Sequence, residues 1–180
     1  MILCWDLKGK HMLKIRPART EDAFDIANIN TLGWKVGYRG LVCDSILDEM
    51  QVTEKRIQRT KEHIANAEIF LVAEQNNKAV GFLRGGKPKR ENLPYSYEIH
   101  VFYVHPDHWR SGIGTALFNA FKEKIKVDDF CVYALDGNIR GINFYQKMGM
   151  KRFAEFDCDV QINQITIHDL FLGFDGEKNE

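Results

Sequence analysis

The sequence predicts a single mixed α/β domain, in which helices flank a twisted, partly parallel central sheet of about six to seven strands. The length of 180 residues suits one domain with a substantial core. Residues 69–84 have the pattern of an antiparallel hairpin, whereas the later strand patterns alternate with helical ones. Strands that are separated by helices tend to pair in parallel, so an antiparallel part of the sheet should precede a parallel part.

The first part of the chain predicts one strand and several helices. Residues 12–17 alternate in polarity and stop at a proline, which indicates a strand. Thr20 precedes two acidic residues, as at a helix N-terminus, where a hydroxyl caps free N–H groups and acids favour the positive dipole end. We expect this helix to end near Gly33, and further helices at 44–50 and 53–67.

The middle of the chain predicts three strands. Residues 69–73 and 79–84 form the expected hairpin, with a polar turn between them at 75–78. A polar loop at 85–94 follows. Residues 97–104 then have the strongest strand pattern in the chain.

The last part predicts two helices and three strands. The helices are expected at 112–125 and 139–148, and the strands at 130–135, 151–160 and 164–171. The expected buried stripe of the first of these helices comprises Ile113, Leu117, Ala120, Phe121 and the aliphatic stem of Lys124.

The domain is expected to span residues 12–173, after an irregular extension at 1–11 and before a polar tail at 174–180. The first residues contain too short an apolar run for a signal peptide, and no stretch is long enough to cross a membrane, so a cytoplasmic location is the expected default. The four cysteines form no CxxC pair and lie beside no metal-like histidine cluster. We therefore expect reduced thiols and no metal site.

The charge of the chain is balanced, with 25 basic and 25 acidic residues. No overall charge attracts nucleic acid or an anionic membrane, so neither is an expected partner. A binding site for an anion must then be built locally, from backbone amides or a few well-placed cations.

A glycine-rich turn at residues 104–117 carries the main functional signal. It joins a strand to an amphipathic helix, whose first turn has free N–H groups and a partial positive charge. Glycine lets a phosphate approach these amides, so a diphosphate is the expected ligand; a structural turn is the alternative. A dinucleotide fingerprint is disfavoured because Leu117 occupies the third glycine position, and no G-K-[ST] follows for a P-loop.

This turn resembles the acetyl-CoA motif of the GNAT acetyltransferases, [QR]-x-x-G-x-[GA], preceded by V-x-P. Val104 and Pro106 match the leading residues, and Gly112-Ile113-Gly114 matches the glycines. Trp109 stands where the family has Gln or Arg, which removes a side-chain hydrogen bond but leaves the backbone donors. Arg110 could replace part of the missing charge.

A second segment resembles the later GNAT motif, N-x-x-[AG]-x-x-F-Y-x-K-x-G-F, in the expected order and distance from the first. Met150 departs from it by replacing the final Phe. The resemblance covers roughly residues 12–171. The residues that match are Asn138, Gly141, Phe144, Tyr145, Lys147 and Gly149.

The resemblance implies a GNAT fold that transfers an acetyl group from acetyl-CoA to a primary amine of a small molecule or peptide. A homodimer would be ordinary for this family. The alternative is a non-catalytic acyl-CoA-binding sensor or interaction module with the same fold. Capping a helix is an equal alternative for Asn138, and a plain exposed lysine for Lys147. The expected cofactor contacts are Phe102, Tyr103, Val104, Trp109, Arg110, Ser111, Gly112, Ile113, Gly114, Thr115, Asn138 and Lys147.

Tyr145 is the candidate general acid. Transfer releases a thiolate, and a phenol with a pKa of about 10 is still protonated at neutral pH. The resemblance places a proton donor at this position. Packing beside Phe144 is the alternative reading.

Glu98 is the first candidate for the general base and His100 the second, because an amine attacks only when it is neutral. Strand alternation predicts that both lie on one face with Phe102 and Val104. A polar residue on a half-exposed strand is the alternative for each. The remaining acceptor-side candidates, for which ordinary packing is the alternative, are Trp34, Tyr38 and Arg39, with His168 and Asp169 as further guesses.

Overall fold

The computed structural model describes residues 2–4, 13–127, 129–162 and 165–175, and within them nine strands form one sheet. The sheet has the order β1-β2-β3-β4-β5-β6-β9-β7, and β8 pairs with β9. The strands are β1 (Ile2–Cys4), β2 (Leu13–Pro17), β3 (Ile69–Gln75), β4 (Lys78–Gly86), β5 (Tyr97–Val104), β6 (Asp129–Leu135), β7 (Lys151–Arg152), β8 (Cys158–Ile162) and β9 (Ile165–Asp175). The helices are α1 (Ala23–Gly37), α2 (Asp44–Glu49), α3 (Glu54–Asn66), α4 (Ile113–Ile125) and α5 (Ile139–Lys147).

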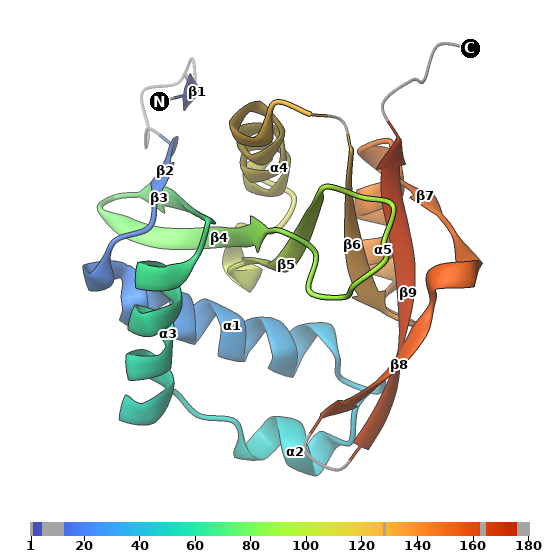
Figure 1. Ribbon diagram of the computed structural model, residues 1–180. Coiled ribbons are helices and arrows are strands. Elements are labelled where there is room, and N and C mark those ends of the chain that lie inside the picture. The colour runs from blue at the N-terminus through green and yellow to red at the C-terminus, as the bar shows by residue number, and fades with distance from the viewer. Residues whose placement is uncertain (1, 5–12, 128, 163–164, 176–180) are drawn as a thin grey trace.

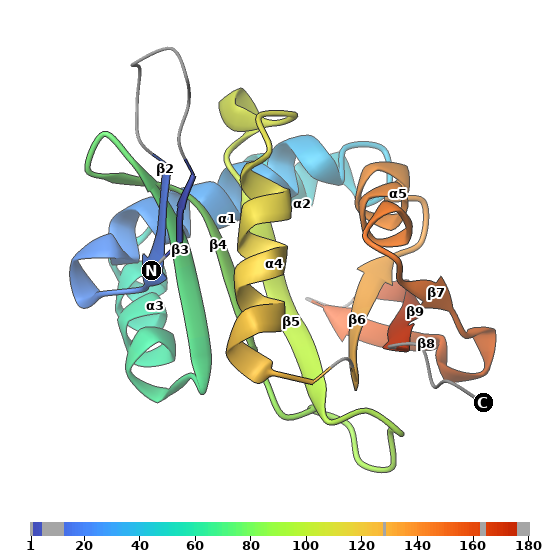
Figure 2. The same cartoon turned by 90° about the horizontal axis from the view of Figure 1, so that it is seen from above.

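The mixed α/β fold class is confirmed, with helices on both faces of the sheet (Figure 1). Helix α4 packs on one face through the largest apolar cluster, which includes Leu83 of β4 and Phe118 of α4. Helices α1 and α3 cover the other face, where Ile29 of α1 packs with Phe82 of β4. Figure 2 shows α4 over β4 and β5, with α1 and α3 beyond the strands.

The sheet is antiparallel except at β5 and β6, which are parallel partners over three residue pairs, from Tyr97↔Phe130 to Ile99↔Val132. Both strands continue beyond the last pair, to Val104 and Leu135. Figure 2 shows the two strands together at one end and apart at the other. The mixed sheet therefore splays open at its centre, at the end of β5 that leads into the glycine-rich turn.

A β-bulge at His100 changes the face that β5 presents. Strand β4 pairs Gly85 with Ile99 and Arg84 with Val101, so His100 is the extra residue. Ile99 and Phe102 both pack on the α4 side, whereas Val101 packs on the α1 and α3 side. The prediction of unbroken alternation is therefore wrong, because Glu98, which neighbours Ile99, lies on the opposite face from Phe102.

Helix α1 continues four residues beyond the predicted end at Gly33, to Gly37. Gly33 is buried inside the helix, and a Cβ there would lie 2.4 Å from Cδ1 of Tyr103. This glycine does not end the helix; it allows α1 to lie directly on the ring of Tyr103 in strand β5. A close contact between elements distant in sequence leaves no local signal, which explains the error.

Three other predictions need correction. The segment expected as one strand at 151–160 is divided into β7 and β8 by a single 3-10 turn at Ala154–Phe156. On α4, Lys124 is exposed, and Phe118 belongs to the buried stripe instead. Ile2–Cys4 form strand β1 within the segment expected to be irregular, while 5–11 and the turn residues 163–164 lie outside the described residues.

We expect Gly33→Ala to destabilise the protein by about 1–3 kcal/mol, because the added methyl group overpacks the contact with Tyr103. Urea denaturation followed by circular dichroism measures the change. Gly37→Ala is the matched control, since a Cβ there meets nothing within 4 Å. The control should be neutral or more stable by up to about 1 kcal/mol, because alanine favours helix over glycine. Equal effects of the two substitutions would contradict the contact.

Candidate active site

Hydroxyl groups from three tyrosines gather where β5 and β6 diverge. The Oη atoms of Tyr38, at the end of α1, and Tyr103, on β5, lie 2.9 Å apart. Tyr145 of α5 lies close enough that the charges of Tyr38 and Tyr103 influence it or are influenced by it. Elements far apart in the chain thus converge on this point.

The phenol of Tyr145 is buried and protonated. Its side chain is 8% exposed and its ring centroid lies 6.4 Å from that of Phe102. Burial raises the pKa of Tyr145 well above its ordinary value, and proximity to Tyr38 raises it further. Burial also raises the pKa of Tyr38 and of Tyr103. The cluster therefore holds its protons across the whole neutral pH range.

The glycine-rich turn leaves the first amides of α4 open. Gly112 caps the helix with φ +85°, in the left-handed region that favours glycine, and no side chain caps this end. Ala116 is the first residue here whose N–H bonds back into the helix, to the carbonyl of Gly112 at 3.0 Å. A Cβ on Gly112 would meet nothing within 4 Å, so the space in front of the turn is open. Backbone donors facing open space suit a bound diphosphate.

Trp109 closes this turn in a way that the sequence motif did not predict. Its indole Nε1 donates to the carbonyl of Val104 at 2.8 Å, where β5 ends. The guanidinium of Arg140, from the first turn of α5, stacks 3.5 Å from the centre of the indole ring. The stack brings an exposed cation to the glycine turn from the second motif.

Glu98 and His100 lie on the same side of the sheet as α1 and α3. Glu98 is 5% exposed, and its Oε2 accepts a hydrogen bond from the N–H of Lys89 at 2.9 Å. His100 Nε2 lies 2.9 Å from the carbonyl oxygen of Lys87. Because a carbonyl only accepts, Nε2 must carry the proton, which leaves Nδ1 as the basic nitrogen. Burial lowers the pKa of His100, so the ring is neutral at pH 7.

Several other predicted residues have identifiable structural partners. Asn138 caps α5, since its Oδ1 accepts from the N–H of Gly141 at 3.1 Å. Ile113 is 3% exposed and belongs to the core, so that only its backbone can face a ligand. Lys147 is exposed. Arg39 is exposed and pairs with Asp48 of α2 at 2.7 Å.

The acceptor-side candidates separate into two groups. Trp34 stacks edge-on against Tyr38, with ring centroids 4.9 Å apart, and packs in an apolar cluster with α2. Asp169 of β9 is half-buried, its pKa is raised by burial, and its charge raises the pKa of Tyr38. His168 is exposed and pairs with Asp159 at 2.8 Å. Asp169 therefore lies near the tyrosine cluster.

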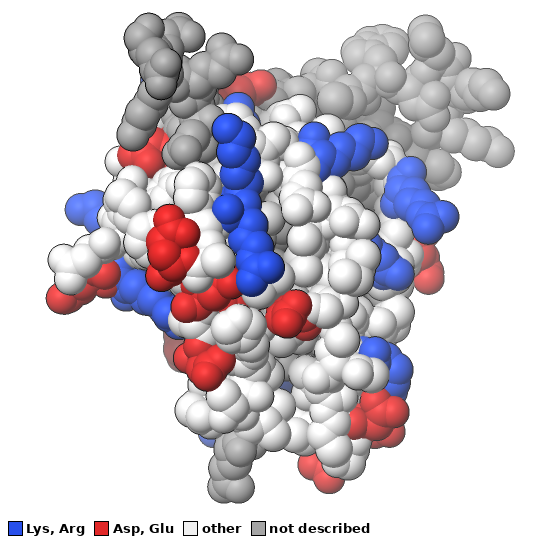
Figure 3. All heavy atoms as spheres, turned by 90° about the vertical axis from the view of Figure 1, so that its right-hand side faces the viewer, with Lys and Arg blue, Asp and Glu red and all other residues white. Residues whose placement is uncertain are grey.

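The surface beside α5, β7 and β9 mixes both signs of charge (Figure 3). Basic and acidic side chains lie side by side there. None of the helices in the described part of the chain is long and apolar enough to cross a membrane. Within the same residues, no group of His, Cys, Asp and Glu could hold a metal ion.

A sequence model of the Acetyltransferase (GNAT) family matches residues 39–150, which is more than half of the chain. The chain therefore belongs to the GNAT acetyltransferase family. It is an acetyl-CoA-dependent acetyltransferase, and acetyl-CoA is its co-substrate.

Individual relatives are more distant. An uncharacterized N-acetyltransferase of Bacillus subtilis, YuaI, is 24% identical over 152 residues, which cover 83% of this chain and 86% of YuaI. PaiA N-acetyltransferase from Thermoplasma acidophilum, in complex with coenzyme A, has a TM-score of 0.67 at 18% identity and covers 90% of this chain and 99% of its own. YncA from Salmonella typhimurium, with acetyl-CoA, has a TM-score of 0.65 at 17% identity and covers 93% and 96%. At these identities the structural matches show the fold.

Proposed function

We propose that this protein transfers the acetyl group of acetyl-CoA to a primary amine of a small molecule or peptide, with Tyr145 as general acid. The observation that carries the proposal is the position of the Tyr145 phenol, beside the splayed strands and the open amides of α4. The donor thioester would lie between β5 and β6, and the acceptor would approach from the α1 side of the sheet.

The backbone at the start of α4 would hold the diphosphate of the coenzyme. The open N–H groups at Gly112–Thr115 and the helix dipole favour a negative charge there. Arg140, stacked on Trp109, supplies the cation that the family motif usually carries at position 109. The side chain of Tyr103 faces α1, so only its backbone would contact the coenzyme.

Tyr145 would protonate the sulfur as the carbon–sulfur bond breaks. The amine nitrogen bonds to the acetyl carbon, the thiolate leaves with the electron pair of the broken bond, and the phenol gives it a proton. Burial raises the pKa of the phenol, and the same dry surroundings disfavour a thiolate, so transfer to sulfur is favourable. The phenol recovers its proton through the acceptor or water.

Glu98 is the proposed base, acting directly or through water. Deprotonating an amine of pKa about 10.4 costs roughly 4–5 kcal/mol at pH 7, so an acceptor for that proton is needed. Glu98 is a buried carboxylate on the acceptor side of β5. His100 and Asp169 are the competing groups on that side.

We expect Tyr145→Phe to lower kcat by about 10²-fold or more while the affinity for acetyl-CoA changes little, because the ring stays and only the proton donor is lost. Release of free thiol from acetyl-CoA with a panel of primary amines measures turnover, and calorimetry measures affinity. Unchanged kcat would remove Tyr145 from the mechanism. Coenzyme binding by the wild type without turnover on any amine would favour a non-catalytic binding module.

For Glu98→Gln, we expect the acid limb of the pH profile of kcat/KM to be lost or displaced, because that limb reports protonation of the base. Glu91→Gln, an exposed change in the neighbouring loop, is the control. An unaltered acid limb in Glu98→Gln, together with a displaced limb in Asp169→Asn or His100→Gln, would assign the base to another residue.

Arg140→Gln should weaken coenzyme A binding about five- to tenfold, with less dependence on salt, because a phosphate contact by a guanidinium is lost. Calorimetry at two salt concentrations measures both effects. Lys151→Gln removes an exposed charge from β7 and should leave binding unchanged. Equal affinities of the Arg140 variant and the wild type would exclude Arg140 from the phosphate site.

A further inference from the structure

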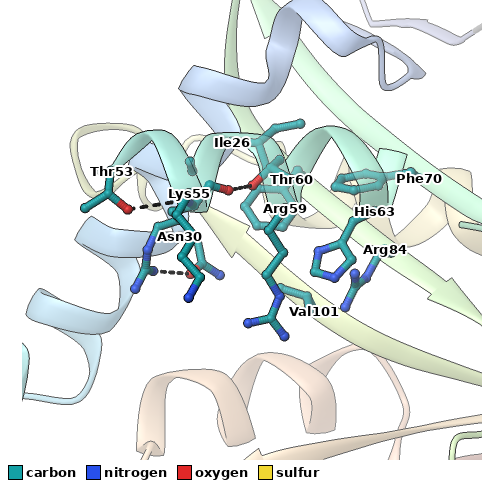
Figure 4. Close-up of a pocket in the computed structure, with 13 residues that line it drawn as sticks. Ile26, Asn30, Thr53, Lys55, Arg59, Thr60, His63, Phe70, Arg84 and Val101 are labelled. Carbon is teal, nitrogen blue, oxygen red and sulfur yellow. Dashed lines mark hydrogen bonds between the residues drawn. The ribbon is translucent and has the colours of Figure 1, made fainter. Parts of the chain in front are cut away.

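A cavity of about 350 Å³ lies between α1, α3, β4 and β5, on the acceptor side of the sheet (Figure 4). Its apolar lining comes from the sheet and includes Phe82 and Val101. The size is within the range of small-molecule sites, roughly 300–1,000 Å³. The cavity is separate from the glycine turn, since no residue of that turn lines it.

The side chains around this cavity are rich in positive charge. Lys55, Arg56, Arg59 and His63 of α3 line it, together with Arg84 of β4, and none of its lining residues is acidic. The spacing of 55, 59 and 63 places these residues on one helical face. Figure 4 shows Arg59 and His63 directed away from the axis of α3, toward Val101 and Arg84.

The cations at the cavity lack acidic partners. The Nε of Arg84 is buried and has no hydrogen-bond partner among the residues that the structure describes. Burial, and then the charge of Arg59, lower the pKa of Arg84. Arg56 reaches only neutral groups, Asn30 Oδ1 at 3.4 Å and Thr31 Oγ1 at 3.5 Å. A buried guanidinium without a counter-charge is costly, so the arrangement is suited to an incoming anion.

Nearby acids do not neutralise these cations. Glu62 of α3 raises the pKa of His63, but burial and the charges of Arg84 and Arg59 outweigh it, and the net shift is downward. Glu62 accepts a hydrogen bond from Gln58 at 3.3 Å and does not line the cavity. Glu98 is engaged by the N–H of Lys89.

We propose that this cavity binds a carboxylate or phosphate group of the acceptor substrate, so that the enzyme acetylates amines that also carry an anion. The assignment rests on the proposed function. Arg84 is paired in register with Val101, next to the bulge residue His100, and the charge of Arg84 acts on His100. An acceptor anchored by its anion at Arg84 would present its amine along β5 toward Glu98. A guanidinium fork suits both carboxylate and phosphate.

The test compares amines that differ only in charge. A series of ω-amino carboxylates of increasing length is measured against the matching amides, and phosphoethanolamine against ethanolamine. The wild type should prefer the anionic member in kcat/KM by about tenfold or more, mainly through KM. Arg84→Gln and Arg59→Gln should each reduce this preference. Lys61→Gln, an exposed change on α3 outside the cavity, should keep it.

Folding of the variants is checked by thermal unfolding in buffer without polyvalent anions. Arg84→Gln removes a buried unpaired cation, so its Tm should equal or exceed that of the wild type. Arg59 is exposed, so Arg59→Gln tests the cavity even if the Arg84 variant does not fold. The proposal is overturned if the wild type shows no preference for anionic amines, or if both arginine variants keep it.

Calorimetry with inorganic phosphate and with citrate separates this proposal from the proposed function. Heat with the wild type and Lys61→Gln, but not with Arg84→Gln, supports the anion site. If that heat occurs but the amine preference is independent of Arg84, the anion belongs to a separate effector and the acceptor assignment fails. Absence of heat in the wild type overturns the anion site itself. Absence of turnover on every amine refutes the proposed function alone.

Discussion

Strands β5 and β6 pair in parallel over three residue pairs and then separate, and the rest of the site depends on this separation. Continuous pairing would close the sheet and leave no room between the strands for a donor group. Because the strands part, Tyr145 of α5 can approach Tyr38 and Tyr103 across the gap. The bulge at His100 adds a second effect, since it places Glu98 on the α1 side while Phe102 stays on the α4 side. Donor and acceptor thus have separate approaches to one point.

Local signals in the sequence predicted much of the fold and the phosphate turn. A glycine before an amphipathic helix predicted an open helix start, and Gly112 has the left-handed backbone that such a start requires. Asn138 before α5 predicted either a cap or a coenzyme contact, and the cap is present. The fold class and the family were predicted because they depend on short patterns in a fixed order. The roles of Tyr145 and Glu98 remain predictions.

Features that depend on contacts between distant segments were not predictable. The bulge at His100 is set by pairing with β4, so strand alternation alone put Glu98 on the wrong face. Arg140 lies inside the second motif but gains its meaning from Trp109, about thirty residues earlier, and only the fold brings them together. The cations of α3 had the appearance of an ordinary solvated helix face until Arg84 was found opposite them.

The contact between Gly33 and the ring of Tyr103 has a mechanical consequence. With only hydrogen at position 33, backbone and ring are already at van der Waals distance, so α1 cannot move closer to the sheet there. The helix can rock about this pivot but cannot descend. A wall of the acceptor cleft is therefore stiff where Tyr38 meets Tyr103. Any adjustment to acceptors of different bulk must come from α2 and α3, on either side of that rigid joint.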